Sequence, residues 1–160
     1  MVKMDGILNI YKPKGITSHD VVNKVRRIFN TKQVGHTGTL DPNAEGVLVV
    51  CLNQATKLVQ FLESDVKKYR CELILGISTD TYDITGNIVD SDKQLVLSEE
   101  EVIATIKKFV GKQKQLPPIY SSIKVNGKKL YEYARKKQEV TIESRDIEIF
   151  EIDNFTSLIK

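Results

Sequence analysis

The sequence predicts an α+β domain in which helices flank a mixed or antiparallel sheet. Short segments alternate apolar and polar residues between glycines, prolines and asparagines, which is typical of strands. Other segments repeat apolar residues at helical spacing after a serine or threonine that can cap a helix. The two kinds of segment are interleaved along 160 residues, a length that predicts one domain with its own core.

The first third of the chain is expected to contain two strands and two helices. These are a strand over residues 6–11, a helix starting at Thr17 or Ser18, a strand over 46–52 and a short helix over 55–62. Lys12-Pro13-Lys14-Gly15 is a turn signature between the first two. The apolar positions expected to pack are Val21, Val22, Val25, Ile28 and Phe29 in the first helix, and Leu58, Phe61 and Leu62 in the second.

The remaining two thirds alternate in the same way. We expect strands over residues 69–75, 87–89, 120–125, 141–142 and 147–152, an acidic loop over 80–86 and a short helix over 130–134. Ser98 and Glu101 form a capping box that opens another helix, which Gly111 closes. The apolar residues that this helix is expected to bury are Val102, Ile103, Ile106, Phe109 and Val110. Asn126-Gly127 predicts a tight turn.

The composition is that of a soluble globular chain, with 41% hydrophobic and 28% charged residues. The longest apolar run, residues 47–52, is too short to cross a bilayer, and the first residues lack the apolar core of a signal peptide. Cys51 and Cys71 lie in apolar runs, so we expect two buried, reduced thiols in a cytoplasmic protein. Two cysteines and two histidines without matched spacing predict no zinc site.

The net charge of +3 is unevenly distributed. Residues 1–40 carry seven basic and two acidic residues, and residues 103–137 carry ten basic residues against Glu132 alone. Residues 63–102 between them hold ten acids and four bases. Two basic segments separated by an acidic one suggest a positive face that binds a polyanion such as RNA, although lysines that only solvate a surface would give the same count.

Residues 35–48 are the most informative stretch. They place the lone carboxylate Asp41 in a glycine- and threonine-rich turn just before an apolar strand. Pro42 restricts Asp41 to extended or turn geometry, and glycines at 35, 38 and 46 permit tight bends or close approach of a ligand. Such a loop suits catalysis by a single acid, but a plain connection between a helix and a buried strand has the same pattern.

Residues 35–42 and 46–48 resemble the signature of the TruB family of tRNA pseudouridine synthases. Five further stretches agree in the same order: residues 12–18, 55–57, 67–70, 117–124 and 127–135. The resemblance covers residues 6–150, and it implies the N-terminal part of a pseudouridine synthase catalytic fold. It also implies isomerisation of uridine 55 to pseudouridine in the TΨC loop of tRNA, without cofactor or metal.

By this resemblance Asp41 is the catalytic aspartate, an anion in a dry pocket that acts on the ribose by covalent addition or by proton abstraction. Tyr69 is the active-site tyrosine that stacks on the extruded uracil. His36 fills the space left in the RNA loop by the flipped base, and Asp83 orients that histidine. Read without the family, Tyr69 is a core residue of a strand, His36 a turn residue and Asp83 a solvated charge.

The same resemblance implies a substrate-binding surface around these residues. Gly35, Thr37, Gly38, Lys12 and Lys57 are expected to bind substrate. The expected contacts to the RNA backbone, which position the RNA rather than read its sequence, are Lys14, Lys24, Arg26, Arg27, Lys124, Lys128 and Lys129.

The chain departs from the family pattern after Phe150. The family's later strand contributes an arginine that pairs with the catalytic aspartate, and Arg145 lies too early to replace it. The rest of the catalytic domain and the C-terminal RNA-binding domain have no counterpart either, so residues 1–160 look like an N-terminal part. We therefore expect an inactive fragment that self-associates through an uncovered sheet edge.

One other function remains open on the sequence, and a second, weaker one fails. A non-catalytic RNA-binding module or RNA chaperone would keep the fold and the basic face without the chemistry. A nucleotide-binding phosphate loop at residues 35–39 lacks the Gly-Lys-Ser/Thr that grips phosphate and Mg²⁺.

Overall fold

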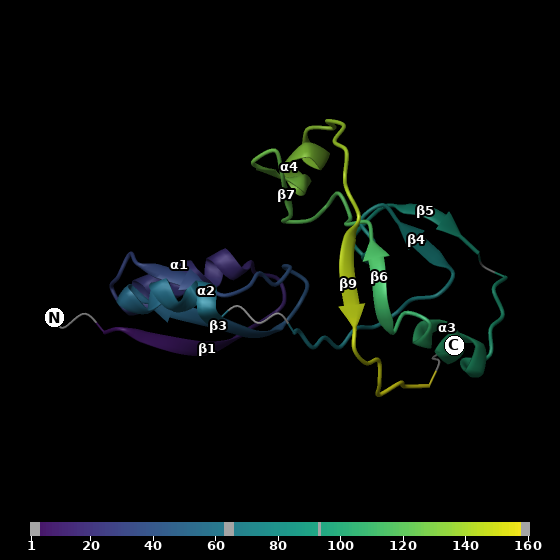
Figure 1. Ribbon diagram of the computed structural model, residues 1–160, viewed down its shortest axis with the longest axis horizontal. Helices are drawn as coiled ribbons and strands as arrows, with labels where there is room; N and C mark the ends of the chain where they lie inside the picture. Colours follow the sequence, from purple (N-terminus) through teal and green to yellow (C-terminus); the bar gives the residue numbers. More distant parts are fainter. Residues whose placement is uncertain (1–3, 63–65, 93, 158–160) are drawn as a thin grey trace. The chain divides into compact units, whose positions relative to one another are not determined.

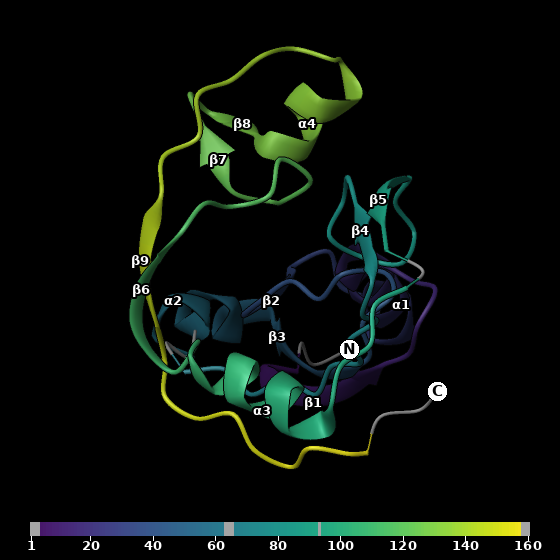
Figure 2. The same ribbon diagram turned by 90° about the vertical axis from the view of Figure 1, so that its right-hand side faces the viewer.

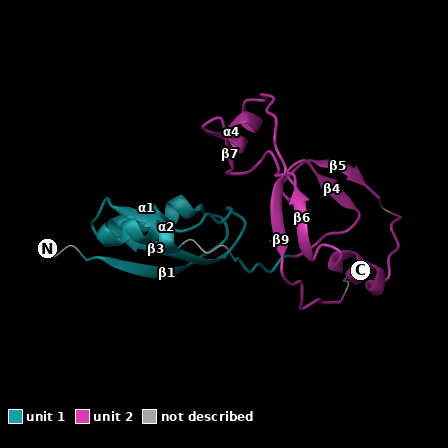
Figure 3. Cartoon of the chain, viewed as in Figure 1, with its two compact units in different colours: residues 1–71 teal, residues 72–160 magenta. Residues whose placement is uncertain are grey.

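A computed structural model describes residues 4–62, 66–92 and 94–157. The chain divides into two compact units, unit 1 (Met1–Cys71) and unit 2 (Glu72–Lys160), shown in Figure 3. Both units combine helices with antiparallel strand pairs, which confirms the predicted α+β class. None of the helices among the described residues is long and apolar enough to cross a membrane.

Unit 1 is built on a three-stranded antiparallel sheet (Figure 1). The strands β1 (Gly6–Lys12), β3 (Gly46–Leu52) and β2 (Val34–His36) lie in the order β1-β3-β2. The pairing of β1 with β3 is unbroken along all seven residues. The strands expected near residues 6–11 and 46–52 are confirmed, whereas β2 was not expected because three residues are too few to show a period.

Helix α1 (Ser18–Ile28) begins with the capping box of Thr17 and Asp20. The Thr17 hydroxyl and amide donate to the Asp20 carboxylate, and these bonds hold the pKa of Asp20 below its ordinary value. Thr17, rather than Ser18, is therefore the N-cap. Ile28 was expected on the packed face, but it is exposed because the helix ends there.

Helix α1 and one face of the sheet enclose the hydrophobic core of unit 1. The buried residues of this core are Val21, Val22, Val25, Val34, Leu48, Val50 and Leu52. Leu8, Ile10, Ile16 and Phe29 pack around it. The valines at helical spacing and the alternate residues of β1 and β3 thus face the same layer, as the sequence pattern predicts.

The short helix expected over residues 55–62 is a 3-10 helix, η1 (Asn53–Leu58), followed by one turn of α-helix, α2 (Val59–Leu62). A side chain at Gly35 would contact Thr56 and Val59, so this segment lies against β2. The expected packing of Leu58, Phe61 and Leu62 is wrong, since all three are exposed.

The described residues of unit 2 form three separate two-stranded pairs and two helices (Figure 2). The strand pairs are β4 (Ile77–Thr79) with β5 (Ile88–Ser91), β6 (Gly111–Gln115) with β9 (Arg145–Ile149), and β7 (Lys124–Val125) with β8 (Lys128–Lys129). The helices are α3 (Glu99–Lys107) and α4 (Leu130–Arg135). The capping box of Ser98 and Glu101 and the turn at Asn126-Gly127 are confirmed.

Several expected elements of unit 2 are wrong or shorter. Residues 69–75 form no strand, residues 141–142 are irregular, and the strand expected over 120–125 is reduced to β7. Gly111 begins β6 instead of closing α3, and only Val102 of the expected buried face of α3 is buried. A segment with an alternating or amphipathic pattern folds into a strand or helix only where its apolar face can pack against another surface. Unit 2 offers little such surface.

We predict that Leu52→Ala lowers the free energy of unfolding of unit 1 by about 2–5 kcal/mol, because it opens a cavity in a fully buried site. Val47→Ala in the same strand is the control. The Val47 side chain is 68% exposed, so its truncation should change the free energy by less than about 0.5 kcal/mol. Urea unfolding followed by circular dichroism measures both, and equal losses would contradict this core.

Candidate active site

The loop that carries Asp41 connects β2 to β3. It starts where the Thr37 amide donates to the Val49 carbonyl (3.1 Å), and it contains a turn closed by the Ala44 amide on the Asp41 carbonyl (3.1 Å). It ends at Gly46, whose φ of +145° favours glycine. Asp41 therefore lies at the tip of a connection whose two ends are fixed in one sheet.

Residues 15–18 hold this loop on both sides of Asp41. The Gly15 amide donates to the Pro42 carbonyl (2.8 Å). The Ser18 hydroxyl accepts from the Leu40 amide (2.9 Å) and lies 3.2 Å from the Leu40 carbonyl, to which it can donate. Both neighbours of Asp41 in the chain are thus anchored, which restricts where its carboxylate can lie.

The buried side chain of Lys12 also holds the Asp41 loop against the turn after β1. This side chain is fully buried at the end of β1, and its Nζ donates to the carbonyls of Pro13 (3.0 Å), Ile16 (2.8 Å) and Pro42 (3.4 Å). An ammonium group has three donors, and all three are used. The expectation that Lys12 binds substrate or phosphate is therefore wrong in this structure, because a buried and fully bonded ammonium cannot meet a phosphate.

The Asp41 side chain is exposed, as are Pro42 and Asn43 beside it. The sequence led us to expect a dry pocket, and within this chain that expectation is wrong. The loop projects from the sheet, and its hydrogen bonds to residues 12–18 fix its backbone without covering the carboxylate. The arrangement presents a positioned acid to an approaching molecule.

The other expected substrate-binding residues of unit 1 surround the start of this loop. His36 pairs with Val50 in the sheet, and its Nδ1 is buried without a hydrogen-bond partner among the described residues. Gly35 precedes it in β2, and Thr37 and Gly38 follow, all half-buried. Lys57 lies in η1 and is exposed.

Tyr69 lies in an irregular segment of unit 1, and its side chain is 69% exposed. The strand expected around it would have crossed the boundary between the two units, after Cys71. Cys71 is exposed too, contrary to the expected buried thiol, whereas Cys51 is fully buried in β3 as expected. Burial raises the pKa of the Cys51 thiol.

Asp83 belongs to unit 2, in the loop between β4 and β5. The Thr85 hydroxyl and amide and the Thr81 hydroxyl donate to its carboxylate. These bonds, that of the Thr85 hydroxyl above all, hold the pKa of Asp83 below its ordinary value. The carboxylate is thus anionic and bonded within its own loop.

The basic residues expected to contact RNA are mostly exposed. In unit 1, Lys14, Lys24 and Arg27 are exposed, and Arg26 is half-buried with its guanidinium donating to Asn23 (3.1 Å). Exposed lysines on α1 and on the turn before it are free to reach a phosphate, in contrast to Lys12.

In unit 2, the basic residues surround α4. Lys124 and Lys128 are exposed, and Lys129 is half-buried with its Nζ 5.5 Å from the centre of the Tyr131 ring. The Arg135 guanidinium lies 5.1 Å from the same ring. Cations held beside an aromatic ring form a surface suited to phosphates and unpaired bases.

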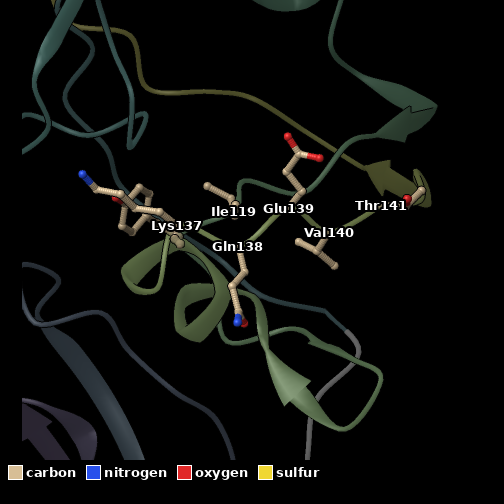
Figure 4. Close-up of a pocket in the computed structure, with 8 residues that line it drawn as sticks. Ile119, Lys137, Gln138, Glu139, Val140 and Thr141 are labelled. Carbon is tan, nitrogen blue, oxygen red and sulfur yellow. The ribbon is translucent and has the colours of Figure 1, made fainter.

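An open groove of about 680 Å³ lies on the same part of unit 2. It is lined by the segments before and after α4, which include Ile119, Glu139 and Val140, and by Ala134 of α4 itself (Figure 4). No predicted site residue lines it. Among the described residues, no three or more His, Cys, Asp and Glu side chains are placed to hold a metal ion.

Sequence reasoning missed the role of Gly15 and Ser18. The sequence pattern of residues 12–18 predicted a turn, a helix cap and contacts to RNA. It did not predict that these residues bind the Asp41 loop. The only signal in the sequence was that residues 12–18 and 35–42 occur together, because hydrogen bonds between two loops leave no periodic pattern.

Residues 26–157 match the TruB family pseudouridylate synthase (N terminal domain). The chain belongs to the TruB family. The curated relatives include tRNA pseudouridine synthase B of Alkaliphilus oremlandii, 53% identical over 150 residues that make up 94% of this chain and 50% of the relative. They also include tRNA pseudouridine synthase B of Oceanobacillus iheyensis, 55% identical over 93% of this chain and 50% of the relative. This TruB-family chain spans about half the length of these relatives.

The fold of the chain also resembles that of a solved structure. The chain is similar to one in the crystal structure of a Cbf5-Nop10-Gar1 complex, with a TM-score of 0.50 and 28% sequence identity. The match covers 76% of this chain and 31% of the other.

We predict that Lys12→Met lowers the free energy of unfolding of unit 1 by about 1–3 kcal/mol, because it leaves three carbonyls without their donor. Lys14→Met, two residues on at an exposed position, should change it by less than about 0.5 kcal/mol. Denaturant unfolding measures both variants. A more stable Lys12→Met protein would show that the buried ammonium does not hold this loop.

Proposed function

We propose that this TruB-family chain is the N-terminal part of a catalytic domain that converts uridine 55 of the tRNA TΨC loop to pseudouridine. Asp41 is the catalytic aspartate. The observation that carries the proposal is the anchoring of Leu40 and Pro42 by residues 12–18, which holds one exposed carboxylate at a fixed position. Family membership supplies the reaction class.

The chemistry needs a carboxylate anion beside the ribose. The bond from ribose C1′ to uracil N1 breaks, the uracil turns and C5 bonds to C1′. The proton on C5 leaves to solvent and N1 takes up a proton from solvent, so the product is an isomer of the substrate. Asp41 acts on the ribose either by adding to C1′ or by removing a proton from the sugar. Because Asp41 is exposed in this chain, the bound RNA supplies much of the water-free surrounding that strengthens its interaction with the reacting sugar.

The flipped uracil needs an aromatic face and the RNA loop needs a replacement for the lost base. The exposed ring of Tyr69 is available for stacking on the uracil. His36, next to the Asp41 loop, takes the vacated position. Gly35, Thr37 and Gly38 shape the backbone around it.

The T-arm backbone is bound by lysines and arginines, most of them exposed. In unit 1 these are Lys14, Lys24, Arg26 and Arg27, and in unit 2 they are Lys124, Lys128 and Lys129, while Lys57 binds the substrate nucleotide. Each contact positions the RNA, while the shape of the T-arm and the flipped bases give specificity. We place this activity in the cytoplasm, without metal or cofactor.

The isolated 160-residue chain is expected to be inactive, because it spans about half the length of these relatives. Joining it to the C-terminal half of the Alkaliphilus oremlandii relative should restore pseudouridine formation. Release of tritium from tRNA labelled at uridine C5 measures both proteins. Turnover by the isolated chain would contradict this expectation.

In that fusion, we predict that Asp41→Asn reduces pseudouridine formation at least about a thousandfold, because an amide is neither a nucleophile nor a base. Binding of tRNA should change less than about threefold, since binding rests on many phosphate contacts. Asp90→Asn, at another exposed acid, is the control and should keep full activity. An active Asp41→Asn fusion would reject the catalytic role and favour an RNA-binding module or chaperone.

A further inference from the structure

The two peptide groups that flank Asp41 are both held by hydrogen bonds. The peptide before it carries the Leu40 carbonyl, which lies 3.2 Å from the Ser18 hydroxyl. The peptide after it carries the Asp41 carbonyl, which accepts from the Ala44 amide at 3.1 Å. With both peptide groups held, φ and ψ of Asp41 are set, and only the torsions of its side chain remain free to turn the carboxylate.

The two sides of Asp41 are held by different means. On the side that follows, the ring of Pro42 restricts ψ of Asp41, and the Gly15 amide and Lys12 Nζ donate to the Pro42 carbonyl. On the side that precedes, there is no proline, and the Ser18 hydroxyl binds Leu40. The φ angle of Asp41 therefore depends on this one side chain more than ψ depends on any other.

The Ser18 hydroxyl serves both backbone groups of Leu40. It accepts from the Leu40 amide at 2.9 Å, and it is placed to donate to the Leu40 carbonyl at 3.2 Å. A serine hydroxyl has one proton to donate and two lone pairs, so one side chain can make both bonds. Leu40 is thus held much as a strand residue is held by its neighbour.

Ser18 itself is rigidly placed. It is the first residue of α1, and it is only 3% exposed. The capping box of Thr17 and Asp20 fixes the start of this helix, and Val21 and Val22 of the same turn lie in the core of unit 1. The hydroxyl therefore projects from a fixed point where water has little access to replace its bonds. All of these contacts lie within unit 1.

We propose that Ser18 is a positioning residue for the catalytic aspartate and acts through Leu40. The inference rests on the proposed function, in which Asp41 acts on the ribose of the flipped uridine. Ser18 does not touch the ribose. By holding the peptide before Asp41, it sets the direction in which the carboxylate leaves the loop. A displacement of about 1 Å in a reacting group can lower a rate about a hundredfold.

Hydrogen exchange in the 160-residue chain tests the positioning without catalysis. Ser18→Ala removes both bonds to Leu40, so the Leu40 amide should exchange at least about tenfold faster. The Ala44 amide does not contact Ser18, but it should also exchange at least about tenfold faster, because its acceptor is the Asp41 carbonyl. The Gly15 amide, bound to Pro42, should change less than about threefold.

Unchanged exchange at the Ala44 amide would show that Ser18 does not hold the backbone of Asp41, and it would overturn the proposal. Equal acceleration of the Leu40, Ala44 and Gly15 amides would overturn it too, since the whole loop would then have loosened together.

Kinetics of the fusion with the C-terminal half of the Alkaliphilus oremlandii relative test the consequence for the reaction. Ser18→Ala should lower the single-turnover rate of tritium release at saturating tRNA at least about tenfold. The dissociation constant for tRNA should change less than about threefold, because the phosphate contacts are intact. A general loss of structure would weaken binding as well as the rate.

Thr17→Ala in the same fusion is the matched control. It removes the N-cap of the same helix, one residue away, and so it also lowers stability. The Thr17 side chain bonds to Asp20 and not to the Asp41 loop, so the single-turnover rate should stay within about threefold. Circular dichroism shows whether both variants are folded. An unchanged rate with Ser18→Ala, or an equal loss in the two variants, would reject the role of Ser18.

Asp41→Asn in that fusion separates this inference from the proposed function. If Asp41→Asn is inactive while Ser18→Ala keeps the full rate, the role of Ser18 is wrong and the proposed function stands. If Asp41→Asn is active, the proposed function is wrong and Ser18 positions no catalytic group.

Discussion

The ammonium group of Lys12 is fully buried, and the position of the Asp41 loop follows from how that charge is satisfied. A buried charge is tolerated only when its hydrogen bonds are complete. Here the acceptors are three backbone carbonyls, from the turn after β1 and from Pro42 beside Asp41. Because carbonyls rather than a carboxylate hold the ammonium, Asp41 itself is left uncommitted. The charge that stabilises the loop is therefore separate from the charge that we propose to react.

This separation explains why unit 1 can present an exposed acid in a fixed place. The sheet fixes the two ends of the loop, Gly15 and Ser18 fix its middle, and the core under α1 holds the sheet. The Asp41 side chain itself stays exposed to solvent in unit 1. In the proposed reaction, bound RNA covers this side chain, so water is excluded only when substrate is in place.

The sequence predicted most of unit 1 and less of unit 2, for a physical reason. The strands β1 and β3 and the helix α1 bury one face each, so their periodic patterns match their packing. The segment around Tyr69 has the same alternation, but it has no partner strand among the described residues. The strand predicted over residues 69–75 was therefore wrong. Asp41 and His36 were found through the family motif. The buried state of Lys12 and the bonds of Ser18 depend on a contact between distant loops, which no local pattern encodes.

Hydrogen exchange of two backbone amides in the wild-type chain tests the anchored loop most directly. The Gly15 amide donates to Pro42, and the Leu40 amide donates to Ser18, so each reports on one side of Asp41. If these bonds hold the loop to the sheet, both amides should exchange about as slowly as the amides of the paired strands β1 and β3. Exchange near the rate of an unstructured peptide, while those strands stay protected, would show that Asp41 is not held in place.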